Sequence, residues 1–130
     1  MTTTHTDGLS VLVVEDDDDA ATVEALLLGM EHHQVTIASD GPAALREVRQ
    51  AAPDVVLLDI GLPGLDGHEV ARQIHEMRLP KQPMLIAVTG RSDTQDVRRS
   101  REVGIDMHLV KPVAPDTLCL LLRHLSRLLH

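Results

Sequence analysis

Acidic residues are crowded directly after the first apolar run of the chain. Five consecutive carboxylates (15–19) follow the apolar residues 11–14. A pair of like charges at about 4 Å repels by about 4 kcal/mol at an effective dielectric near 20, so water, a helix N-terminus or a cation must offset the repulsion. The residue types favour 17–19 as the cap and first turn of a helix. That division leaves Glu15 and Asp16 for a cation.

Three further reactive side chains end or directly follow later apolar runs: Asp59, Thr89 and Lys111. The carboxyl ends of parallel strands share one edge of a sheet, where ligands of such folds bind. An all-oxygen cluster suits a hard cation such as Mg²⁺, which usually takes one or two carboxylates together with water and phosphate oxygens. A carboxylate nucleophile, a metal and a fixed positive charge are what phosphoryl transfer requires. Each residue alone could be a cap, a turn residue or a solvated group, and only their combination favours the functional interpretation.

Five apolar runs alternate with five helical patterns. The expected strands are 9–14, 34–38, 54–59, 83–89 and 106–110. The expected helices lie near 17–31, 41–51, 66–78, 92–103 and 114–129. Three of the runs are nearly continuous Val, Ile and Leu, as is typical of a parallel sheet covered on both faces. The (βα)5 alternation with right-handed crossovers predicts an α/β, doubly wound domain with a five-stranded parallel sheet.

Several local patterns refine this expectation. The first helix carries one apolar face at i, i+3, i+4 and i+7, formed by Val23, Leu26, Leu27 and Met30. No glycine follows it, so His32 is expected in the left-handed terminating position. Asp66, three residues before Glu69, resembles a capping box. Leu120 and Cys119 lie off the leucine stripe of the last helix, which indicates either an exposed partner patch or ordinary surface side chains.

Length and composition exclude several classes of protein. The chain has 130 residues, 43% of them hydrophobic and none of them Phe, Tyr or Trp, so one domain with an aliphatic core is expected. Twelve basic and twenty acidic residues give a net charge of −8, which disfavours an electrostatic nucleic-acid binder. A single Cys119, no secretion signal and no membrane-spanning run predict a cytoplasmic setting. Residues 1–8 are expected to form a loose tail and 9–130 the domain.

Four segments in order, "VLVVEDD", "DVVLLDIGLPGLDG", "AVTG" and "HLVKPV", resemble a response-regulator receiver domain. The resemblance covers 9–129 and implies a flavodoxin-like strand order 2-1-3-4-5. It implies that Asp59 accepts the phosphoryl group. It also implies further site residues: Glu15 and Asp16 as the acidic pair for Mg²⁺, Asp59 and the backbone carbonyl of Gly61 as further metal ligands, and Thr89 and Lys111 on the phosphoryl oxygens. The Lys111–Pro112 bond is expected to be cis.

The resemblance also implies a role in a two-component phosphorelay. The donor would be a histidine kinase or a histidine phosphotransfer protein, and the domain would catalyse only its own phosphorylation and dephosphorylation rather than act as an enzyme on other substrates. His108 stands at the switch position, where Tyr or Phe is usual. The face formed by 92–129 would then contact an effector or a second copy. The chain could be a stand-alone regulator or a receiver excised from a hybrid histidine kinase.

Other classes fit less well. A haloacid-dehalogenase-like phosphatase needs a second Asp where Gly61 stands, and a P-loop hydrolase needs a G-x-x-x-x-G-K-[ST] motif, which is absent. A dinucleotide-binding domain would place a glycine-rich turn where the chain carries the acidic run 15–19, and the histidines lack the spacing of a zinc site. The remaining alternative is a receiver-like protein-interaction module that is not phosphorylated.

Overall fold

The computed structural model describes residues 8–60, 66–90 and 94–129, and it shows a parallel sheet between two layers of helices. The strands are β1 (Ser10–Val14), β2 (Gln34–Ala38), β3 (Val55–Asp59), β4 (Met84–Thr89) and β5 (Met107–Val110). The helices are α1 (Asp18–Met30), α2 (Gly41–Ala51), α3 (Gly67–Glu76), α4 (Thr94–Glu102) and α5 (Pro115–Leu129). Every expected element is present, with its ends shifted by at most two residues. The expected tail falls almost entirely outside the described residues.

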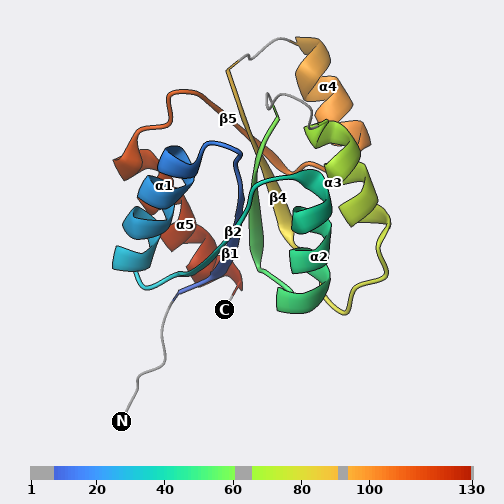
Figure 1. The fold of residues 1–130 in the computed structure, drawn as a ribbon. Coiled ribbons are helices and arrows are strands. Elements are labelled where there is room, and N and C mark those ends of the chain that lie inside the picture. Colours follow the sequence, from blue (N-terminus) through green and yellow to red (C-terminus); the bar gives the residue numbers. More distant parts are fainter. Residues whose placement is uncertain (1–7, 61–65, 91–93, 130) are drawn as a thin grey trace.

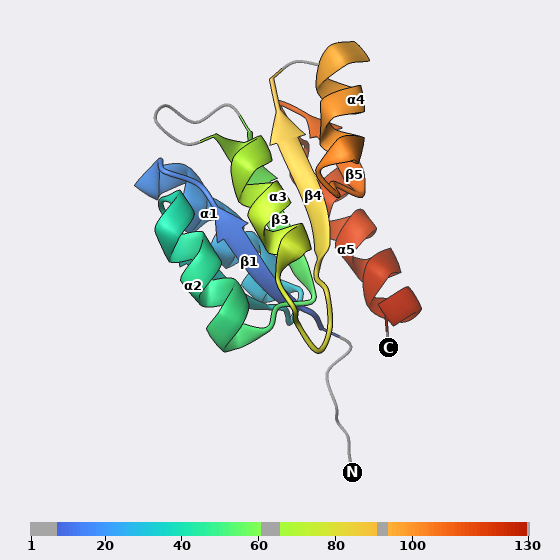
Figure 2. The same ribbon diagram turned by 90° about the vertical axis from the view of Figure 1, so that its right-hand side faces the viewer.

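The strand order is β2-β1-β3-β4-β5, with all neighbours parallel, which confirms the expected doubly wound topology. Helices α1 and α5 cover one face of the sheet, and α2, α3 and α4 cover the other (Figures 1 and 2). Because side chains alternate along each strand, the aliphatic core divides into two clusters. Leu12, Val56 and Leu85 face the α2–α4 layer, whereas Val11 and Ile86 face α1 and α5.

The apolar face of α1 is directed away from the sheet. Val23, Leu26 and Met30 are 56%, 64% and 75% exposed, whereas Ala21 and Leu28 are the residues that α1 buries. After the first turn, apolar residues occur on several sides of the helix, so the i, i+3, i+4, i+7 pattern does not identify the side that packs. Ala21 and Leu28 form the side that packs on the sheet, while Val23, Leu26 and Met30 lie outside it.

The ends of the helices follow the sequence expectation. Asp17 caps α1 by accepting from the backbone N–H groups of Asp19 and Ala20, at 2.9 and 3.1 Å. His32 has φ 71°, so it terminates α1 in the left-handed region without a glycine. In α5, the expected stripe is turned inward, with Leu118 and Leu122 among its buried members.

Candidate functional site

The carboxyl ends of four strands bring the expected reactive residues together. Glu15 follows β1 and Asp59 ends β3, and the register between these strands pairs Val14 with Leu58 one residue earlier. On the other side of β3, Asp59 pairs with Val88 of β4, so Thr89 lies one residue further along the neighbouring strand. The sheet register therefore places an acid, a second acid and a hydroxyl side by side.

Asp59 and Lys111 form an ion pair across this edge. The Lys111 Nζ donates to Asp59 Oδ2 at 2.5 Å. Asp59 is only 3% exposed, whereas the side chain of Lys111 is nearly half exposed. The hydrogen bond to Asp59 raises the pKa of Lys111, and burial opposes it. A carboxylate sealed at the end of a central strand is thus paired with a fixed cation.

Glu15 is the second buried acid of the site. Its Oε2 accepts from the backbone N–H of Asp17 at 3.1 Å. Burial raises the pKa of Glu15 above its usual range, the Asp17 N–H lowers it, and the nearby Asp59 raises it again. Residues 17–19 cap and begin α1, and Asp16 is exposed. The like-charge repulsion at the buried site therefore acts between Glu15 and Asp59.

These residues fit a magnesium ion in their donor chemistry. Glu15 and Asp59 offer carboxylate oxygens near each other. Burial is the main cause of the raised pKa of Glu15, and a cation would relieve the repulsion that Asp59 adds to it. Within the described parts of the chain, no three His, Cys, Asp or Glu side chains form a preassembled metal cage. Mg²⁺ does not require one, because it usually retains several waters. Gly61, the expected backbone ligand, lies outside the described residues.

Thr89 and the β5 end complete the edge. Thr89 is buried, and its carbonyl accepts from the backbone N–H of Lys111 at 2.7 Å, which fixes the start of the loop after β5. The peptide bond between Lys111 and Pro112 is cis, as expected. His108 lies three residues earlier on β5 and is half-buried, with its Nε2 2.6 Å from Ser100 Oγ of α4.

The first turn of α3 packs against the end of β3. A Cβ at Gly67 would lie 2.8 Å from Ile60 Cδ1, 3.0 Å from Ile60 Cα and 3.3 Å from the Asp59 carbonyl oxygen, so a larger residue would require Ile60 to shift. Asp66 caps the helix by accepting from the N–H groups of His68 and Glu69.

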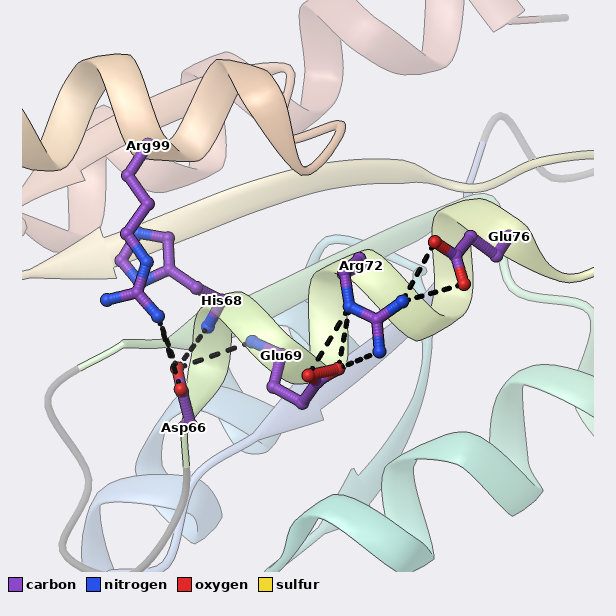
Figure 3. Close-up of polar contacts among 6 residues, drawn as sticks. All are labelled: Asp66, His68, Glu69, Arg72, Glu76 and Arg99. Carbon is purple, nitrogen blue, oxygen red and sulfur yellow. Dashed lines mark hydrogen bonds and ion pairs between the residues drawn. The ribbon is translucent and has the colours of Figure 1, made fainter.

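Side-chain ion pairs extend from this turn along α3 and across to α4. Asp66 Oδ2 lies 3.2 Å from the Arg99 guanidinium of α4 (Figure 3). The carboxylate of Glu69 binds Arg72. Arg72 also reaches Glu76, one turn further along α3. Asp66 therefore makes the N-cap hydrogen bonds of the expected capping box, whereas the Glu69 side chain pairs with Arg72 on the surface of α3.

Sequence reasoning missed two features of the site region. Glu24 of α1 is half-buried, and burial, followed by the charges of Glu15 and Asp59, raises its pKa to about 7. His68 and Ser100 are buried and hydrogen-bonded to each other at 3.1 Å. Glu24 could have been suspected as an acid inside an apolar helix. Nothing in the sequence around Ser100 indicates that it points inward.

Comparison with known proteins places the chain in a family. Residues 11–123 match the response regulator receiver domain. The transcriptional regulatory protein AfsQ1 of Streptomyces coelicolor is 41% identical over 80% of this chain, and the sensory transduction protein RegX3 of Mycobacterium bovis is 38% identical over 91%. The chain spans 45% and 51% of the lengths of these relatives, about half of each.

Solved structures agree with this placement. A CheY-like receiver domain protein from Methanospirillum hungatei has a TM-score of 0.83 at 26% identity, covering 92% of this chain and 94% of that one. The receiver domain of the sensor histidine kinase PA1611 from Pseudomonas aeruginosa, with a magnesium ion coordinated in its active-site cleft, has a TM-score of 0.80 at 28% identity, covering 92% and 98%.

The chain belongs to the response-regulator receiver domain family of two-component signalling. In the described part of the chain, no helix is both long and apolar enough to cross a bilayer.

Proposed function

We propose that this domain takes a phosphoryl group onto Asp59 and switches its surface in response. The observation that carries the proposal is the buried Asp59 carboxylate held 2.5 Å from the Lys111 ammonium at the carboxyl edge of the sheet. The donor would be a histidine kinase or a histidine phosphotransfer protein. Under this proposal, the chain belongs to a phosphorelay and catalyses only its own phosphorylation and dephosphorylation.

In the transfer, an Asp59 oxygen attacks phosphorus while the bond from phosphorus to the donor's imidazole nitrogen breaks, and that electron pair returns to the ring. Lys111 stays beside the carboxylate and balances charge on the phosphoryl oxygens. Thr89, on the neighbouring strand end, would donate its hydroxyl hydrogen to one of them. Glu15, Asp16, Asp59 and the Gly61 carbonyl would hold Mg²⁺, which supplies further positive charge at the phosphoryl oxygens.

The signal would leave through the face formed by 92–129, which includes His108 and carries the exposed Leu120. An effector protein or a second copy of the chain would bind there. A net charge of −8 opposes direct contact of this domain with nucleic acid. Among the relatives, MtrA of Mycobacterium leprae is named a DNA-binding response regulator. In such a protein, DNA contact would belong to the part outside the segment matched here.

The test is incubation with acetyl phosphate and Mg²⁺, followed by intact-mass measurement. We expect the wild-type protein to gain one phosphoryl group, and the Asp59→Asn variant to gain none, because the amide keeps the shape but is no nucleophile. Asp18→Asn is the matched control, since Asp18 belongs to the same acidic run but lies in the first turn of α1.

Phosphate on the Asp59→Asn variant at the wild-type level would refute the assignment of Asp59. No gain of mass by the wild-type protein would favour the alternative of a receiver-like interaction module that is not phosphorylated.

A further inference from the structure

Three polar residues from three elements form one buried hydrogen-bonded chain behind the site. His68 of α3 is 4% exposed, Ser100 of α4 is 1% exposed, and His108 of β5 is half-buried. The Ser100 Oγ lies 3.1 Å from His68 Nε2 and 2.6 Å from His108 Nε2. One hydroxyl therefore joins two imidazole rings across the layer that covers this face of the sheet.

The position of His108 on β5 explains why it reaches α4. His108 pairs with Ala87 of β4, and Ala87 belongs to the core cluster on the α2–α4 face. Its neighbours Met107 and Leu109 face the opposite cluster. The pleat thus points the imidazole toward α4 over a small alanine, which leaves room for the ring. Ser100 meets it from the last turn of α4.

The number of available hydrogens decides which group donates in each of the two hydrogen bonds of Ser100. A serine hydroxyl has one hydrogen, so it cannot donate to both rings, and one ring must donate to it. The Nδ1 of His108 is buried and has no hydrogen-bond partner among the described residues. A buried N–H without a partner is rarer than a buried acceptor without one. His108 Nε2–H therefore donates to Ser100 Oγ, and Ser100 Oγ–H donates to His68 Nε2.

His68 lies on the turn that packs against the acceptor strand. Gly67, its neighbour, packs closely on Asp59 and Ile60, where a Cβ would lie 3.0 Å from Ile60 Cα and 3.3 Å from the Asp59 carbonyl oxygen. A second link, between Asp66 and Arg99, spans the same two helices on the exposed side. Movement of Ile60, next to Asp59, would therefore reach α4 through Gly67, His68 and Ser100.

We propose that Ser100 and His68 are positioning residues that hold the His108 ring inward, against α4, in the unmodified protein, and so couple α3 to α4. Turning the ring outward removes the hydrogen bond from Ser100, whose hydroxyl is too buried to exchange it for water. In this chain the hydrogen bonds of an imidazole replace the apolar contacts that a Tyr or Phe ring would make. We call the retention of the His108 ring against α4 by these hydrogen bonds the inward hold. The coupling to phosphorylation rests on the proposed function of Asp59, whereas the inward hold does not.

The first experiment uses two-dimensional ¹H–¹⁵N NMR of the unmodified protein to determine which imidazole nitrogen carries the hydrogen in His68 and in His108. We expect the hydrogen of His108 on Nε2 and that of His68 on Nδ1. In Ser100→Ala the His108 Nε2–H signal should be lost to exchange, and amide exchange in α4 should become about tenfold faster. Ser100→Thr keeps a hydroxyl and should restore both signals. Arg99→Ala, which breaks only the exposed link, is the matched control and should leave the His108 signal unchanged.

A His108 ring with its hydrogen on Nδ1, or a Ser100→Ala variant with wild-type His108 signals, would overturn the inward hold. The second experiment adds acetyl phosphate and Mg²⁺ and follows the α4 amide shifts. We expect Ser100→Ala to gain the phosphoryl group yet to lose most of the α4 shift change, and Ser100→Thr to recover it.

The outcomes separate the two proposals. A wild-type protein that gains no phosphate would refute the function proposed for Asp59. The NMR result on the unmodified protein would still test the inward hold by itself. A phosphorylated Ser100→Ala variant with the full wild-type α4 response would refute the coupling while leaving Asp59 in place.

Discussion

Helices α1 and α4 stand on opposite faces of the sheet, and they are held by different forces. Helix α1 buries Leu28 completely in the aliphatic core and is joined to α5 by an ion pair between Glu31 and Arg123. In the described part of α4, the buried side chain is Ser100, which is hydrogen-bonded on two sides. Apolar burial is strong and has no preferred direction, whereas hydrogen bonds are weaker and directional.

The difference suits the roles proposed for the two helices. The first turn of α1 must keep the acidic residues in place through every phosphorylation cycle. Helix α4 must hold one position until it is displaced. Directional bonds define such a position and can be broken at moderate cost, so the polar chain through Ser100 fits a movable element better than a larger core would.

The largest effect should come from removing the apolar anchor of α1. Leu28→Ala should lower the free energy of unfolding by about 2–5 kcal/mol, because it deletes fully buried methyl groups and leaves a cavity. Ser100→Ala should cost less, about 1–3 kcal/mol. Urea denaturation of both variants measures the comparison. A larger loss for Ser100→Ala than for Leu28→Ala would contradict it.

Hydrogen exchange should show α4 as the least stable helix. Its amides in 94–102 should exchange at least tenfold faster than those of α1 and of β1, a difference of about 1.4 kcal/mol in opening free energy. The reason is that the buried side chain in the described part of α4 is the polar Ser100. Native-state exchange followed by mass spectrometry measures this directly, and protection of α4 equal to that of β1 would refute it.

Glu24 should make stability depend on pH. Its pKa is about 7 in the folded protein and near 4.5 when exposed, so the folded state keeps a proton that the unfolded state has already released. Stability therefore falls as pH rises from about 4.5 through 7. Glu24→Gln should remove about 1 kcal/mol of this fall, since Glu24 is only half-buried. Denaturation at pH 5 and pH 8 provides the test, and an unchanged pH profile would count against it.

The smallest effect should come from the outer face of α1. Leu26→Gln should change the free energy of unfolding by less than about 0.5 kcal/mol, because Leu26 is 64% exposed. A loss of about 2 kcal/mol that depends on protein concentration would show that this face is covered by another copy in solution. Leu28→Ala, two residues further along the same helix, is the internal comparison.

The sequence alone predicted the fold and the position of the candidate site residues at one edge of the sheet. Near-continuous Val, Ile and Leu runs identify buried parallel strands, and that topology forces strand ends such as Asp59 and Lys111 to one edge. Local chemistry is also legible, because caps and terminators depend on neighbours in the chain. Asp17 caps α1 and His32 terminates it, as expected.

Only the tertiary structure decided which side of α1 packs on the sheet and which polar groups come into contact. Val23, Leu26 and Met30 face outward because the sheet packs against the side that carries Ala21 and Leu28, and periodicity in α1 does not reveal that side. The contact of His68, Ser100 and His108 joins residues 32 and 8 positions apart. Such a contact depends on how two helices and a strand are placed in space, and no local pattern of residues encodes that placement.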